Sequence, residues 1–167
     1  MLMRRVLFGA ALALLACGSA FAAPSDKDLK KIEDSLKKAG PEATLKKFYD
    51  CDNGIGWKLL ETGDPRAVKL AFGVMPAADA CYGEVMAIEL GYALTANPTL
   101  MMGYYKQYPQ DFPDWCVPGL IGPTEAEWKA VIDKAEKAVL SVKDPALAKP
   151  KQICIDQIKQ ARATPLN

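Results

Sequence analysis

The chain has 167 residues, with 21 basic and 20 acidic side chains and no histidine, and half of its residues are hydrophobic. A net charge close to zero argues against a nucleic-acid or anionic-membrane partner, because such partners are usually bound through a strongly basic surface. The lack of histidine excludes Ser-His-Asp and Cys-His catalysis and any histidine general base.

The N-terminus predicts a secretory signal peptide. Arg4 and Arg5 precede an apolar run over residues 6–16, and Ala20-Phe21-Ala22 has the spacing of small residues that a cleavage site needs. The apolar run is too short to remain in a bilayer as an anchor. We therefore expect residues 1–22 to be removed after export to the periplasm.

A second interpretation of the N-terminus stays open. Leu14-Leu15-Ala16-Cys17 resembles a bacterial lipobox, in which Cys17 would be acylated and would anchor the chain to a membrane. Leu15 fits this pattern poorly, and a conventional cleavage site lies downstream. No later stretch is long and apolar enough to cross a membrane, so we expect residues 23–167 to form one domain without a transmembrane segment.

Helix start and stop signals recur along residues 23–167. Ser25 begins a helical pattern that Gly40 ends, and Pro41 begins the next helix. An Asx-Pro pair, which places a capping side chain before a proline in the first turn, occurs three times. These pairs are Asp64-Pro65, Asn97-Pro98 and Asp144-Pro145.

Two longer helices are predicted in the second half. Residues 79–96 are apolar almost all the way round, which indicates a core helix covered by its neighbours. Thr124 and Glu127 form a capping box ahead of an amphipathic stretch that reaches residue 142. Because no stretch alternates with period two, the sequence predicts an all-α domain of seven or eight helices arranged as stacked helical hairpins.

The four cysteines after the leader predict two disulfides, as is usual for an even number in an exported protein. We favour Cys51–Cys81 and Cys116–Cys154, which would close loops of similar length, and the other pairings stay open. Their spacing contains no C-x-x-C and the chain has no histidine, so we expect no metal site and no cofactor.

The most distinctive candidate for recognition is the aromatic segment, residues 104–115, which contains two prolines and directly precedes Cys116. Its candidate binding residues are Tyr104, Tyr105, Tyr108, Phe112 and Trp115. One interpretation is a stiffened recognition loop, because its ordering cost would be small before binding. The other is a strap whose rings fold down onto the helices.

A stripe of small residues on the 79–96 helix suggests a second candidate. Glu84 lies on this stripe and would form the floor of a groove, whereas the structural alternative is tight packing against another helix or a narrow solvent-exposed edge. Glu84, Asp111 and Asp114 are also candidate carboxylates for an enzyme acting on cell-wall glycan, which needs two acids placed across a cleft.

The central part of the chain resembles a group of small exported proteobacterial helical proteins. The resemblance covers roughly residues 57–102, with Cys116-Val117-Pro118 and Cys154 fitting it downstream. The motifs that carry it are Gly63-Asp64-Pro65, Leu70-Ala71, Ala78-Asp79-Ala80, Ala93-Leu94 and Asn97-Pro98. It implies an exported helical protein and brings no activity, cofactor or site residue with it.

The sequence therefore favours a periplasmic binding protein without catalytic residues, whose partner is another exported or envelope protein. An inhibitor or immunity-type protein fits this description. The alternatives are the carboxylate-dependent glycan enzyme and a lipid-anchored structural protein of the envelope.

Overall fold

The computed structural model describes residues 25–120 and 122–164. The predicted signal peptide and the lipobox at Cys17 lie outside these described residues. Within them the protein is all-α, with seven α-helices, four short 3₁₀ segments and two disulfides, which confirms the predicted fold class.

The elements follow one another along the chain with short connections. The α-helices are α1 (Asp26–Phe48), α2 (Ile55–Leu60), α3 (Pro65–Val74), α4 (Ala80–Ala96), α5 (Pro98–Gly103), α6 (Glu125–Ser141) and α7 (Ala148–Ala163). The 3₁₀ segments are η1 (Met75–Ala77), η2 (Tyr104–Lys106), η3 (Phe112–Trp115) and η4 (Pro145–Leu147).

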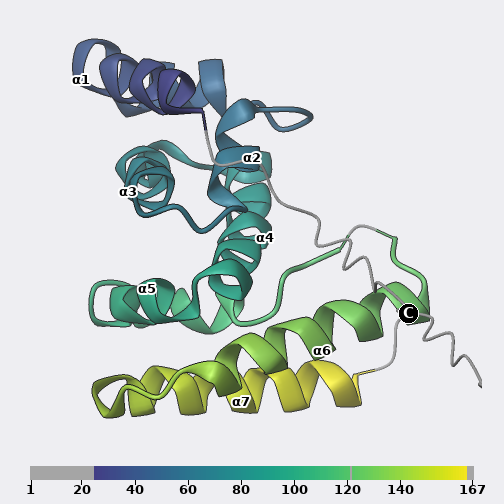
Figure 1. The fold of residues 1–167 in the computed structure, drawn as a ribbon. Coiled ribbons are helices and arrows are strands. Elements are labelled where there is room, and N and C mark those ends of the chain that lie inside the picture. Colours follow the sequence, from purple (N-terminus) through teal and green to yellow (C-terminus); the bar gives the residue numbers. More distant parts are fainter. Residues whose placement is uncertain (1–24, 121, 165–167) are drawn as a thin grey trace, which may run out of the picture.

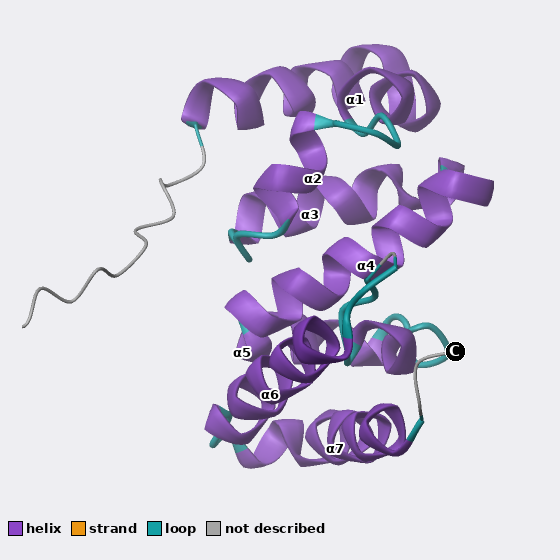
Figure 2. Cartoon of the chain, turned by 90° about the vertical axis from the view of Figure 1, so that its right-hand side faces the viewer, coloured by secondary structure: helices purple, strands orange, loops and turns teal. Residues whose placement is uncertain are grey.

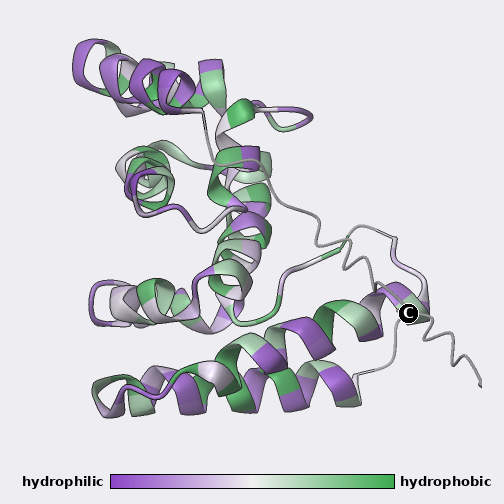
Figure 3. Cartoon of the chain, in the orientation of Figure 1, coloured by the Kyte–Doolittle hydropathy of each residue, from purple (hydrophilic) through white to green (hydrophobic). Residues whose placement is uncertain are grey.

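The helices form a stack with α1 at one end and the antiparallel pair α6 and α7 at the other (Figures 1 and 2). Helix α4 runs across this stack and contacts α2, α3, α5, α6 and η3. Figure 3 shows hydrophobic residues concentrated on α2, α3 and α4, whereas α1, α6 and α7 carry many hydrophilic residues. The core therefore lies around α4, and the outer helices are amphipathic.

Helix α1 consists of two helices that meet at the predicted break. Gly40 has a φ of 82°, a conformation that favours glycine, and Pro41 restarts the helix. Leu29 and Ile32 of the first part are buried against the core. The change of direction lets the second part bury Leu45 as well.

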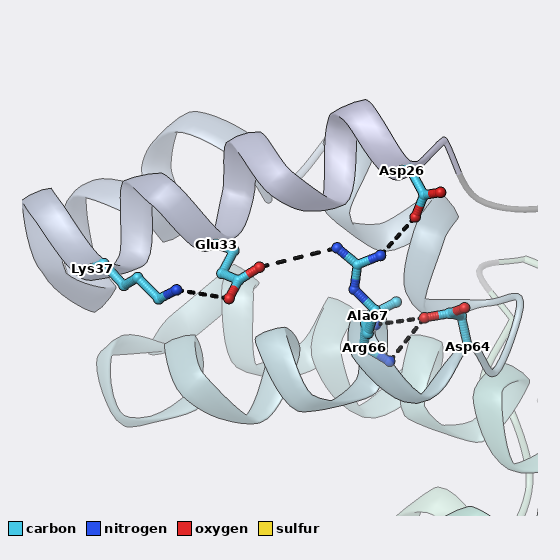
Figure 4. A network of polar contacts seen from close by, with 6 residues as sticks. All are labelled: Asp26, Glu33, Lys37, Asp64, Arg66 and Ala67. Carbon is cyan, nitrogen blue, oxygen red and sulfur yellow. Dashed lines mark hydrogen bonds and ion pairs between the residues drawn. The ribbon is translucent and has the colours of Figure 1, made fainter.

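Polar contacts hold α1 to α3 on the surface (Figure 4). Arg66 of α3 donates to Asp26 of α1 at 2.6 Å and lies 4.0 Å from Glu33, which also accepts from Lys37. All of these side chains are substantially exposed, so solvent screening leaves each pair only a small net contribution to stability. The apolar faces beneath them carry most of the stability of this junction.

The Asx-Pro pairs begin elements as predicted, and one of them also joins two elements. Asp64 accepts from the backbone N–H groups of Arg66 and Ala67, and thereby caps α3. The Asn97 side-chain oxygen accepts from Leu100 N–H, while its amide nitrogen donates to the Gly63 carbonyl at 3.0 Å. Asn97 thus caps α5 and fixes the α2–α3 turn against the end of α4.

Helix α4 is central, but the expectation that it is covered on all sides is wrong for its first turns. Leu90, Ala93 and Leu94 are buried, whereas Ala80 and Glu84 are exposed. The neighbours α2, α5 and α6 cannot all reach the N-terminal half of a 17-residue helix, whose length is about 25 Å. That half contacts η3 and faces η1 across a cavity.

The small residues of α4 receive another segment of the chain. A Cβ atom added to Gly91 would lie 2.7 Å from the Cα of Pro118. Thr95, on the same stripe, donates to the Gly91 carbonyl within the helix. Close packing therefore explains Gly91, which was the structural alternative for this stripe.

The two disulfides join the pairs of cysteines that the sequence favours. Cys51–Cys81 connects the loop after α1 to the first turn of α4, and Cys116–Cys154 connects the residue after η3 to α7. Cys116 and Cys154 are both fully buried. Each disulfide closes a loop of 30 or 38 residues, for which restriction of the unfolded chain is worth about 3–4 kcal/mol.

We predict that Gly91→Ala lowers the free energy of unfolding by about 1–3 kcal/mol, because the new methyl group meets the Pro118 backbone. Gly83→Ala is the matched control on the same helix, where an added Cβ has no atom within 4 Å. The control should raise the free energy of unfolding by roughly 0.5–1 kcal/mol through helix propensity. Urea unfolding with intact disulfides measures both, and equal effects at the two positions would contradict the close approach.

Candidate functional site

The aromatic segment, residues 104–115, lies against the helices. Phe112 and Trp115 in η3 are only 0% and 3% exposed, so these two candidates belong to the core. The rings pack edge to face with their centroids 6.0 Å apart. In this conformation neither side chain is available as a broad contact surface for a partner.

The three tyrosines of the segment are partly exposed and rest on buried rings. Tyr104 and Tyr108 stack on Phe72 of α3, with centroid distances of 4.1 and 4.7 Å. Tyr105 packs on Phe112, and the Lys149 ammonium of α7 lies 5.4 Å from its ring centroid. The inner rings of the segment therefore pack as a strap, and its three tyrosines stay partly exposed.

A cavity of about 230 Å³ opens beside the aromatic segment, between η1, the N-terminal half of α4, and η3. We call it the α4–η3 cavity. Most of its lining residues are apolar in type, and two are aspartates at η3. Its residues are Met75, Ala78, Gly83, Met86, Ala87, Leu90, Asp111, Asp114 and Trp115.

Glu84 is exposed on α4 and does not line this cavity, although its neighbour Gly83 does. A groove floored by Glu84 is therefore not what the fold builds here. Asp111 and Asp114 both come from the η3 side, and within the described part of the chain the facing wall supplies no carboxylate. This cavity lacks the two acids across a cleft that glycoside hydrolysis requires.

The fold brings together a different pair of acids, which sequence reasoning missed. Glu89 of α4 lies within hydrogen-bonding reach of Glu61 at the end of α2. Burial, and then the neighbouring Glu61 carboxylate, raise the pKa of Glu89 to about 8. Glu89 is therefore protonated at neutral pH and can share its proton with Glu61.

The pair borders a second, smaller hollow of about 200 Å³, lined by Glu61, Thr62, Tyr92, Ala96 and Lys134. Burial and the two carboxylates raise the pKa of Tyr92. The one sequence signal for this pair was an acid in the middle of an otherwise apolar helix. Its partner lies 28 positions earlier, and only the packing of α2 on α4 brings the two together.

The described residues 25–120 and 122–164 were also compared with the requirements of a metal site and of a membrane-spanning helix. No three Asp, Glu or Cys side chains there gather as metal ligands. No helix in these ranges is both long enough and apolar enough to cross a bilayer. Comparisons with protein-family models, with curated proteins and with solved structures gave no match to this chain.

The Glu61–Glu89 pair predicts an unusual dependence of stability on pH. Folded Glu89 holds its proton up to about pH 8, whereas in the unfolded chain it ionises near its ordinary value of 4.5. Between these values the unfolded state binds fewer protons, so rising pH lowers the stability of the wild-type protein. Glu89→Gln removes this ionisation, and its stability relative to wild type should increase from pH 4.5 to 8 and then level off.

Urea unfolding at a series of pH values measures this difference. Glu84→Gln is the control, because Glu84 is exposed on the same helix. Its stability relative to wild type should change little across the same range. A constant difference between Glu89→Gln and wild type would show that Glu89 titrates normally.

Proposed function

We propose that this protein is exported to the periplasm and acts by binding another exported or envelope protein, in the manner of an inhibitor or immunity protein. The observation that carries the proposal is that Tyr104, Tyr105 and Tyr108 stay partly exposed while their rings pack on Phe72 and Phe112. Asp111, Asp114 and Trp115 of the same segment line the α4–η3 cavity. Export is supported by the leader-like residues 1–22 and by two disulfides, which persist in oxidising compartments.

A surface of this kind suits binding for an energetic reason. Tyrosines are frequent hot-spot residues, because one end of the ring is apolar and the other forms hydrogen bonds. Here Phe72 and Phe112 already hold the rings, and Cys116–Cys154 holds the end of the segment. Little conformational freedom is lost when a partner docks, so more of the contact energy appears as affinity.

The alternative of a glycan-acting carboxylate enzyme has less support. Glu61 and Glu89 are the acids that the fold pairs, and the Glu61 carboxylate lies close enough to raise the pKa of Glu89. Glycosidases keep their two carboxyl groups at least roughly 5 Å apart, so that a sugar or a water can stand between them. The hollow beside the pair, at about 200 Å³, is also smaller than a typical ligand site of roughly 300–1,000 Å³.

We predict that the double variant Tyr105→Ala/Tyr108→Ala loses capture of the partner while remaining folded. The measurement is a pull-down from periplasmic extract with the tagged exported protein, followed by mass spectrometry. A protein retained by wild type should then be tested for direct binding as a purified component. We expect a loss of affinity of about tenfold or more, corresponding to at least 1.4 kcal/mol.

Tyr92→Ala is the matched control, because it truncates a half-buried tyrosine outside the aromatic segment. Trp115→Ala serves a different purpose: its ring is buried, and its removal should destabilise the fold by about 3–5 kcal/mol. Unchanged partner affinity in the folded Tyr105→Ala/Tyr108→Ala variant would refute the proposed surface.

The intact mass of the exported chain tests the lipid-anchored alternative. A conventional signal peptide predicts a mature protein that begins at Ala23 and carries no lipid. A chain that begins at an acylated Cys17 would instead identify a lipoprotein. The Cys17→Ser variant should be processed normally in the first case and should lose membrane association in the second.

A further inference from the structure

We propose that the α4–η3 cavity receives a lysine or arginine side chain that projects from the partner protein. This inference rests on the proposed binding function and names the chemistry of the anchor. It follows from the size of the cavity, from its apolar walls, and from the charge at its rim.

The size of the cavity suits one long side chain. At about 230 Å³ it is below the roughly 300–1,000 Å³ typical of sites for drug-sized ligands. Hot-spot anchors commonly fill pockets of this kind at the centre of an interface. Tyr108 stands beside it, because its ring packs on Trp115, which forms part of the wall.

The walls suit an alkyl stem. Met75, Ala78 and Ala87 are partly exposed in this lining and supply apolar contact for methylene groups. Trp115 also lines the cavity, but its indole is only 3% exposed, so the choice between a neutral and a charged end rests on the rim.

The negative charge at the rim of the cavity favours a cation over an anion as its occupant. Asp111 and Asp114 are both exposed at the cavity, and neither takes part in an ion pair within the described residues. No lysine or arginine of the described residues lines the cavity. A cation therefore finds two unpaired carboxylates, while an anion would be repelled.

Methionine methyl NMR provides a direct test in the exported protein. Met75 and Met86 line the cavity, whereas Met101 and Met102 are buried elsewhere in the core and serve as internal references. The probes are N-acetyl-lysine-N-methylamide and its neutral analogue, N-acetyl-norleucine-N-methylamide. We expect the lysine probe to shift the Met75 and Met86 methyl signals saturably, and the Met101 and Met102 signals to stay in place.

The matched variants separate the local charge from the overall charge. Asp111→Asn/Asp114→Asn should weaken binding of the lysine probe by about tenfold, as expected for the loss of two exposed ion pairs. Asp34→Asn/Asp52→Asn changes the net charge equally but at residues that do not line the cavity, and it should leave the affinity unchanged. Added salt should weaken binding of the lysine probe to the wild-type protein.

The proposal is overturned if the norleucine probe binds as tightly as the lysine probe, or if neither cavity methionine responds. The experiment needs no natural partner, so its outcome is independent of the pull-down. Partner capture that survives Asp111→Asn/Asp114→Asn would leave the binding function in place and overturn the cationic anchor alone.

Discussion

The contact between Pro118 and Gly91 is the constraint on which the candidate site depends. Because glycine leaves no side chain at position 91, the chain after η3 can cross α4 at backbone distance. The buried Cys116–Cys154 disulfide ties the same segment to α7 two residues earlier. Together these contacts fix an irregular stretch that has few backbone hydrogen bonds of its own. The α4–η3 cavity exists because η3 is held at this place.

Helix α4 serves two different purposes along its length. Its C-terminal half is buried by α2, α5 and α6 and organises the core. Its N-terminal half is apolar yet incompletely covered, and there it forms one wall of the cavity with Gly83, Met86 and Ala87. An apolar wall that the protein itself does not cover is a usual property of interaction surfaces. The same helix thus connects the stability of the fold to the proposed binding function.

The charged side chains are also distributed unevenly between the outer helices and the surroundings of the cavity. Most lysines and arginines with a described ion pair lie on α1, α3, α6 and α7, where they balance nearby acids. The acids around the cavity are left without such partners, and Glu89 avoids an unfavourable charge by keeping its proton. A chain that is almost neutral overall can therefore present a locally negative surface.

The sequence by itself determined the all-α class, several helix starts and the exclusion of histidine-based chemistry. Gly40-Pro41, Asp64-Pro65 and the Thr124 capping box act through backbone groups only a few residues away, so their effects can be recognised locally. Cysteine spacing favoured the observed disulfides but left other pairings open. Tertiary structure decided the remainder: Phe112 and Trp115 turn inward, Glu61 meets Glu89, and Asp111 stands at a cavity whose other walls come from η1 and α4. These outcomes depend on how elements tens of residues apart pack, and no local pattern encodes that.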